Sequence, residues 1–135
     1  MDILIDSSAL MAVLMDEPEK NHIIDLTRNC SLLAPFILPY EIGNALTRLK
    51  KRQVLNNEEV IIIYNDFKKI PLRLLDVEIE KALLIACKHT IYAYDAYYLE
   101  VAKRLNLPVL TLDQSMKEIA KTLKLKILED QYEDI

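Results

Sequence analysis

Short apolar segments alternate with helical patterns along the whole 135-residue chain, and this alternation constrains the fold more than any other feature. The apolar segments resemble strands buried on both faces of a sheet, and they cover residues 2–5, 30–34, 72–76, 108–112 and 125–128. Apolar spacing and capping residues predict helices between them, over residues 9–15, 18–29, 39–52, 57–69, 77–89, 94–105 and 114–123.

The alternation of strands and helices predicts an α/β fold, with a parallel sheet and helices on both of its faces. The length fits one domain with one core, so residues 1–135 are treated as one unit. The acidic end, residues 129–135, is expected to fray. In such sheets, ligands bind beyond the carboxyl ends of the strands. Asp6 and Asp113 each follow a strand, so both are expected at that edge.

The composition excludes several kinds of chemistry. Gly43 is the one glycine of the chain, so a glycine-rich loop for a phosphate or a dinucleotide is absent. The two histidines, His22 and His89, lack metal-ligand spacing and are expected to be solvated, which leaves a serine–histidine mechanism without support. Carboxylates remain as the reactive groups in good supply.

The sequence also bears on the compartment. The apolar start of the chain lacks a basic residue and is interrupted by Asp2 and Asp6, so it is not interpreted as a signal peptide. No apolar run approaches the roughly 20 residues of a membrane helix. Cys30 and Cys87 form no zinc or redox motif, and a reducing cytoplasm is expected.

The two acids that follow strands have an alternative role as helix caps. Asp6 and Asp113 each precede a predicted helix, where a carboxylate accepts a hydrogen bond from a backbone N–H. For the first helix, Ser7 or Ser8 would serve equally well as the cap, so capping does not require an acid there. Cap and functional site therefore stay evenly balanced for both acids.

Two further acids lie inside helices, where capping explains less. Asp95 shares a helical face with Tyr98, Leu99 and Ala102 and thus lies on the apolar face. A carboxylate there needs backbone donors, a cation or a metal ion, so a functional role is favoured. Glu41 lies beside the apolar face of its helix.

Glu41 begins a polar stripe that continues at Asn44 and Arg48, three and seven residues later. The stripe is either a solvated face or the edge of a cleft. Together the four acids indicate a metal site, because carboxylates in proximity repel one another and a divalent cation removes that conflict. Oxygen ligands without histidine or cysteine suit Mg²⁺ or Mn²⁺ rather than Zn²⁺, and such an ion binds substrate phosphate.

The chain resembles PIN-domain ribonucleases, and most closely the VapC-type toxins of prokaryotic toxin–antitoxin pairs. Three segments that span most of the chain carry the resemblance: IDSSAL (5–10), PYEIGNAL (39–46) and YDAYYLEVAKRLNLPVLTLD (94–113). It implies a catalytic and metal-binding set of four acids, Asp6, Glu41, Asp95 and Asp113. It also implies supporting polar side chains that orient these acids or bound waters: Ser8, Asn44 and Thr111.

The resemblance implies a three-layer α/β/α sandwich with a parallel sheet in the order 3-2-1-4-5, which places Asp6 beside Asp113. The chain departs from the family pattern at Lys124, where a glycine often precedes the last strand. The implied activity is endonucleolytic cleavage of RNA by water activated on Mg²⁺ or Mn²⁺. The implied partners are RNA, a VapB-like antitoxin protein and a second copy of the chain.

A chain with net charge −4 needs local basic surface to hold RNA, and outside the four acids 17 acids balance 17 bases. Basic residues gather in two places: Arg48, Lys50, Lys51 and Arg52 at one helix end, and Lys103 with Arg104 at another. A solvated helix end is the equal alternative. Tyrosines cluster near Asp95, and among Tyr92, Tyr94, Tyr97 and Tyr98 we expect core packing for the last and base stacking for one other.

The predicted helix over residues 57–69 carries more apolar side chains than one core face needs. Its core face consists of four residues: Val60, Ile63, Tyr64 and Phe67. Ile61 and Ile62 then project elsewhere, and the extra apolar surface indicates an interface with the antitoxin or with a second copy. A deeply buried helix is the alternative interpretation.

Other classes of function stay open at this point. A catalytically silent RNA-binding or interaction module on the same fold would not need the full set of acids. A haloacid-type phosphohydrolase would need Asp-x-Asp after the first strand, where this chain has Ser8. DNA cleavage is a further alternative, because the metal chemistry does not require a 2′-hydroxyl. Metal-dependent cleavage of RNA is the preferred interpretation.

Overall fold

Four parallel strands form the sheet that positions the rest of the molecule, in a computed structural model that describes residues 1–129. β1 (Asp2–Ile5) pairs with β2 (Ser31–Pro35) on one side and with β4 (Val109–Leu110) on the other. β3 (Leu72–Leu75) pairs with β2 at the edge. The order β3-β2-β1-β4 confirms the predicted α/β class and places the first and fourth strands side by side.

The segment predicted as a fifth strand, residues 125–128, is reduced to one parallel bridge between Val109 and Ile127. Its two backbone hydrogen bonds join Val109 N–H to the Lys126 carbonyl and Leu128 N–H to the Val109 carbonyl, both at 2.9 Å. The segment takes the predicted place beside β4. Because β4 itself has two residues, it cannot support a longer ladder, and the prediction of a regular fifth strand is wrong.

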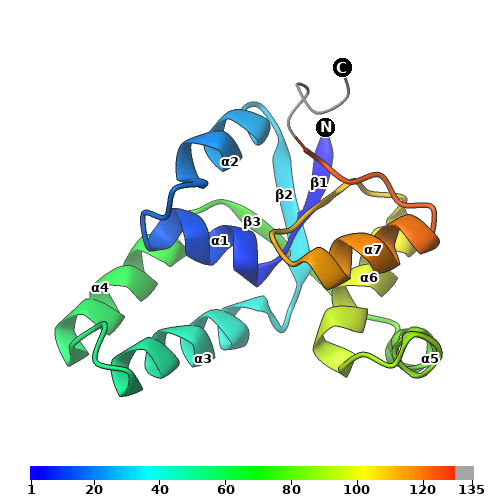
Figure 1. The fold of residues 1–135 in the computed structure, drawn as a ribbon. Helices are drawn as coiled ribbons and strands as arrows, with labels where there is room; N and C mark the ends of the chain where they lie inside the picture. Colours follow the sequence, from blue (N-terminus) through cyan, green and yellow to red (C-terminus); the bar gives the residue numbers. More distant parts are fainter. Residues whose placement is uncertain (130–135) are drawn as a thin grey trace.

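Seven helices in the described residues lie where the sequence predicts helices: α1 (Ser7–Leu14), α2 (Lys20–Leu26), α3 (Leu38–Lys51), α4 (Asn57–Lys68), α5 (Ile79–His89), α6 (Ala93–Leu105) and α7 (Gln114–Thr122). Figure 1 shows α1 to α4 on one side of the sheet and α5 to α7 on the other. The helix predicted over residues 18–29 is shorter than expected at both ends. Of the predicted tail, Glu129 pairs with Lys117 at 3.5 Å, and residues 130–135 lie outside the described residues.

The chain changes direction within the sheet, and this change creates the place for a site. It passes from β1 to β2 to β3, and then returns to add β4 on the far side of β1. Right-handed crossovers in opposite directions place their helices on opposite faces. The carboxyl ends of β1 and β4 therefore form a switch point, where parallel sheets bind ligands. There the Asp6 N–H donates to the Leu110 carbonyl at 3.2 Å.

α6 is the central helix of the second layer, since six of its residues are buried: Ala96, Tyr98, Leu99, Glu100, Val101 and Ala102. It packs against β1, β2 and α5. The predicted apolar face of this helix is confirmed, because Tyr98, Leu99 and Ala102 are each at most 1% exposed. Asp95, in the first turn of the same helix, is half-buried near the switch point.

Lys124 shows how the chain makes the last turn without the glycine that the family often has there. Its φ is 63°, in the left-handed region that glycine adopts most easily. Hydrogen bonds from Lys124 N–H to the Lys121 carbonyl and from Leu125 N–H to the Ala120 carbonyl, both at 2.9 Å, close the end of α7. The backbone keeps the tight turn, and the lysine adopts this conformation at a cost of about 1–2 kcal/mol.

Candidate active site

Asp6 is the buried centre of a polar cluster at the switch point. Its side chain is 4% exposed and caps α1, with Oδ1 accepting hydrogen bonds from the Ser8 hydroxyl at 2.7 Å and from the Ala9 N–H at 3.1 Å. Oδ2 accepts a hydrogen bond from the Thr111 hydroxyl. Of the three residues that could cap this helix, the acid takes the position, and neither serine does. Capping and a place in the cluster are compatible, because Asp6 does both.

Ser8 and Thr111 join the ends of β1 and β4 around this carboxylate. Their hydroxyl oxygens lie 3.3 Å apart. The Leu112 N–H donates to Ser8 Oγ and the Asp113 N–H donates to Thr111 Oγ1, each at 3.0 Å. The two hydroxyls predicted to support the acids therefore contact Asp6, and they fix the backbone that leads to Asp113.

Asp113 caps α7 and accepts a hydrogen bond from the Met116 N–H at 3.1 Å. It is exposed. Its charge raises the pKa values of both Asp6 and Asp95, so the strand-end acids and the α6 acid share one electrostatic environment.

Glu41 lies in the first turn of α3 and is hydrogen-bonded by Tyr98 of α6. The Tyr98 hydroxyl donates to Glu41 Oε1 at 2.5 Å, and the tyrosine is 1% exposed. Core packing was predicted for Tyr98, but its bond to Glu41 was not. The sequence places Tyr98 one turn after Asp95 on the same helical face, which brings its hydroxyl toward the acids but does not specify Glu41 as its partner.

Burial is the main reason why three of the four acids hold their protons more tightly than usual. It raises the pKa of Asp6, against the hydrogen bonds from Thr111, Ser8 and Ala9. It also raises the pKa of Glu41, where the Tyr98 hydrogen bond opposes it and the charges of Asp95 and Asp6 add to it. For Asp95, burial raises the pKa first, and the charges of Asp113 and Asp6 raise it further.

The cluster has the chemistry of a divalent-cation site but is not a closed cage. Among residues 1–129, no ion pair joins a lysine or an arginine to Asp6, Glu41, Asp95 or Asp113. Within the same range, no three His, Cys, Asp or Glu side chains form a ready-made metal site. Oxygen donors that repel one another without a cation fit Mg²⁺ or Mn²⁺, which tolerate water as additional ligands.

Two hollows beside the acids run along α3. One, of about 470 Å³, is lined by Glu41, Asn44, Arg48 and Tyr94, among others. The other, of about 450 Å³, lies between α1 and α3 and includes Arg48 and Arg52. The stripe of Glu41, Asn44 and Arg48 therefore borders a cleft, and Arg48 lies where the hollows meet. Asn44 is exposed in this cleft, and its supporting role stays a prediction.

Apart from Arg48 and Arg52, the basic residues named from the sequence lie away from these two hollows. Lys50 lines a separate hollow at the turn between α3 and α4, and Lys51 is exposed near it. Arg104 is held by Glu100 at 2.8 Å, so it is not a free cation. Of the tyrosines, Tyr94 reaches the acid cleft and packs edge-on against Tyr97, with ring centroids 6.0 Å apart.

Fold and site define a small parallel α/β domain with a carboxylate cluster at its switch point. The chain belongs to the PIN-domain family, whose pattern matches residues 3–122. It is similar to ribonuclease VapC3 of Pyrobaculum aerophilum, with 25% identity over 123 residues, which cover 87% of this chain and 94% of that protein. The chain is thus a relative of the VapC ribonuclease toxins.

Solved structures show the same fold. PAE2754 from Pyrobaculum aerophilum matches with a TM-score of 0.63 and 21% identity, over 88% of this chain and 87% of that one. VapBC2 from Rickettsia felis, bound to a DNA fragment from its promoter, gives 0.65 and 15%, over 96% and 98%. FitAcB from Neisseria gonorrhoeae gives 0.64 and 17%, over 96% and 97%. Among the described residues, no helix is both long and apolar enough to cross a membrane.

Proposed function

We propose that the protein is an endoribonuclease that depends on Mg²⁺ or Mn²⁺ and acts as the toxin of a toxin–antitoxin pair. One observation carries the proposal. Four acids, at positions 6, 41, 95 and 113, influence one another through their charges around the switch point, three of them have raised pKa values, and none pairs with a cation in the described part of the chain. The name of the Pyrobaculum relative, ribonuclease VapC3, supports RNA as the substrate.

Asp6, Glu41, Asp95 and Asp113 would hold the metal ion, directly or through water. When bound, such an ion lowers the pKa of a coordinated water and neutralises charge on the scissile phosphate. Ser8 and Thr111 keep the Asp6 carboxylate in one orientation, since each donates to a different oxygen of it. Tyr98 holds the Glu41 carboxylate through one hydrogen bond to Oε1.

The cleft along α3 gives the RNA a place beside these acids. Arg48 is exposed where its two hollows meet, so it is proposed to contact a phosphate of the substrate. Tyr94, 55% exposed in the hollow that contains Glu41, offers a ring face to an unpaired base. An Arg48→Ala variant is expected to bind RNA more weakly, and unchanged binding and cleavage would remove Arg48 from the proposal.

The partner surface is proposed on α4. Ile61 and Ile62 are 62% and 58% exposed, while Val60, Ile63, Tyr64 and Phe67 pack into or against the core. An exposed aliphatic pair beside a satisfied core face fits contact with a VapB-like antitoxin or a second copy of the chain. A double Ile61→Asp, Ile62→Asp variant is expected to lose one of these associations, and a folded variant that keeps both would contradict the assignment.

The decisive experiment is a cleavage assay on single-stranded RNA with Mg²⁺, with Mn²⁺ and with EDTA. Cleavage is expected with either metal and is expected to stop in EDTA. A silent RNA-binding module on the same fold would bind RNA in all three conditions and cut in none. A matched DNA strand of the same sequence separates RNA from DNA cleavage. Cleavage that persists in EDTA would overturn the metal mechanism.

A further inference from the structure

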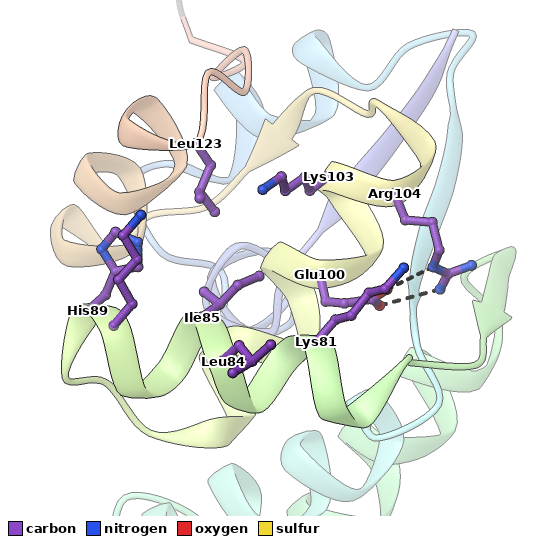
Figure 2. A pocket seen from close by; sticks show the side chains of 9 residues that line it. Lys81, Leu84, Ile85, His89, Glu100, Lys103, Arg104 and Leu123 are labelled. Atoms are coloured by element: carbon purple, nitrogen blue, oxygen red, sulfur yellow. Dashed lines mark hydrogen bonds and ion pairs between the residues drawn. The ribbon is translucent and has the colours of Figure 1, made fainter.

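A further cavity, far more basic than the molecule as a whole, lies between α5 and α6. It has a volume of about 550 Å³, within the range of small-molecule sites. The nine residues that line it include none of the four acids of the candidate active site: Lys81, Leu84, Ile85, Lys88, His89, Glu100, Lys103, Arg104 and Leu123. We refer to it as the α5–α6 cavity, and Figure 2 shows it from close by.

The charge around this cavity contrasts with that of the chain. Four cationic side chains and one carboxylate line it, a net charge of +3, whereas the chain carries −4. Two of the cations are compensated, since Arg104 pairs with Glu100 and Lys81 pairs with Glu78 at the rim, each at 2.8 Å. Lys88 and Lys103 have no ion pair within residues 1–129. They lie on different helices and leave an uncompensated positive potential between α5 and α6.

His89 provides an independent indication of a ligand. The prediction of a solvated histidine is wrong, because His89 is half-buried and its Nε2 is shielded from solvent without a hydrogen-bond partner among the described residues. An orphaned buried polar atom costs about 1–3 kcal/mol. His89 also lines the cavity, so a ligand toward which its ring turns would supply the missing partner.

The rest of the wall is aliphatic. Ile85 and Leu84 come from α5, and Leu123 closes the cavity from the end of α7 (Figure 2). A free inorganic anion would find cations here but would gain nothing from this surface. A ligand with a phosphate and a flat, weakly polar body uses the cations, the aliphatic wall and the orphaned nitrogen together.

We propose that the α5–α6 cavity binds a nucleoside monophosphate, as the free nucleotide or as the phosphorylated end of an RNA strand. Lys88 and Lys103 contact the phosphate, and the base lies against Ile85 and Leu123. His89 Nε2 hydrogen-bonds to the base or the sugar. The site does not use the acids at the switch point, so it holds whether or not the protein cleaves RNA.

The test is titration of the full chain, in EDTA, with adenosine 5′-monophosphate, followed by calorimetry and by backbone amide NMR. EDTA removes any metal that would attract the nucleotide to the acids. Adenosine 5′-monophosphate is expected to bind saturably and to shift the amide resonances of α5 and of the end of α6. Adenosine is expected to bind at least 10-fold more weakly. Equal binding of adenosine, or shifts confined to the acid cleft, would overturn the proposal.

Variants separate the site from general charge attraction. The double variant Lys88→Ala, Lys103→Ala is expected to lower affinity at least 10-fold. Lys68→Ala, Lys69→Ala removes the same charge from the end of α4 and is expected to leave the affinity unchanged; an equal loss in both variants would contradict the site. His89→Leu removes the orphaned nitrogen, so it is expected to weaken binding without lowering Tm. A higher Tm with full affinity would exclude His89 from the site.

The two sources of the ligand are distinguished by competition. A short RNA with a 5′-phosphate displaces the nucleotide if the cavity receives strand ends, and the same RNA without the phosphate does not. If neither RNA competes while the nucleotide binds, the free nucleotide is the ligand. Failure of both the nucleotide and the phosphorylated RNA to bind would overturn the proposal, and an active nuclease in the cleavage assay would still leave the proposed function intact.

Discussion

Two buried acids in this molecule are stabilised in different ways. Asp6 is 4% exposed and Glu100 is 2% exposed. Glu100 is bound by a cation, because Arg104 donates to Oε1 at 2.8 Å and also contacts the Asp76 carbonyl, and the Glu78 N–H completes its hydrogen bonds at 3.2 Å. Asp6 accepts from three neutral donors, and no cation pairs with it among the described residues. Burial and then the charge of Asp113 raise its pKa, and its own charge raises the pKa values of Glu41 and Asp95.

The difference between the two acids separates a structural role from a functional one. A buried carboxylate with a cation and full hydrogen bonding ties elements together; Glu100 joins α6 to the start of α5. A buried carboxylate without a cation is unfavourable in its charged form. The proposed divalent cation would account for such a carboxylate among other acids, because it would compensate their charges.

Neutralising each of these acids in turn gives the sharpest test, and Asp6→Asn has the larger expected effect. The amide oxygen can still cap α1 and accept from the Ser8 hydroxyl, while the NH2 group takes the place of Oδ2 and donates to the Thr111 hydroxyl instead of accepting from it. The substitution removes the charge that would bind metal. RNA cleavage is expected to fall by about 100-fold or more, while Tm stays the same or rises because an uncompensated buried charge is lost. Cleavage rates and thermal melting in EDTA measure both. A stable variant with full activity would end the functional role of Asp6.

Glu100→Gln is expected to show the opposite pattern. It replaces a charge-assisted pair with a neutral one, so the free energy of unfolding is expected to fall by about 1–3 kcal/mol. Glu100 lies outside the acid cluster, so cleavage per folded molecule is expected to stay within about 2-fold of the wild-type rate. A 10-fold loss would correspond to about 1.4 kcal/mol of transition-state stabilisation. Urea denaturation and the same cleavage assay provide the readouts. Loss of activity without loss of stability would show that Glu100, like Asp6, has a functional role.

The positions of the acids in the cluster could partly be predicted from the sequence, but the burial of Glu100 could not. Strand ends place Asp6 and Asp113, and helical spacing puts Asp95 on a buried face, because both patterns are local. Glu100 and Arg104 are four residues apart, a common helical pair, but nothing local showed that the glutamate is buried. Burial depends on how α5 packs against α6, which helical periodicity does not specify.

Long-range contacts account for the remaining misses. Tyr98 and Glu41 are 57 residues apart, and their hydrogen bond depends on how α3 and α6 approach each other from opposite sides of the sheet (Figure 1). His89 lies in a polar segment at the end of a helix, which is typical of a solvated residue. Its Nε2 is nevertheless shielded from solvent where α5 meets α6 and Leu123. The fifth strand failed for a geometric reason, since its apolar pattern was present but its neighbour β4 is short.

The dependence of stability on pH offers a third way to test the uncompensated acids. In the folded state the pKa of Asp6 is raised above its usual 3.8, chiefly by burial. As pH rises above 3.8 the unfolded chain loses this proton first, so stability falls until the folded carboxyl also ionises. In EDTA, the free energy of unfolding of wild type relative to Asp6→Asn is therefore expected to decrease between pH 4 and the folded pKa. Parallel curves would contradict the raised pKa, and added Mn²⁺ is expected to reduce the difference by binding the ionised form.

The smallest expected effect tests whether neutral donors matter to an acid that lacks a cation. Tyr98→Phe removes the hydroxyl that donates to Glu41 Oε1 but keeps the buried ring. The loss of one hydrogen bond, about 1 kcal/mol, corresponds to a decrease of roughly 5-fold in cleavage and in Mn²⁺ affinity if Glu41 holds the metal. Tyr97→Phe is the matched control, because Tyr97 lies on the same helix and its hydroxyl has no hydrogen bond to the four acids in residues 1–129. Equal Mn²⁺ affinity in the two variants would mean that Tyr98 contributes only core packing. The backbone of α3 would then be sufficient to orient Glu41.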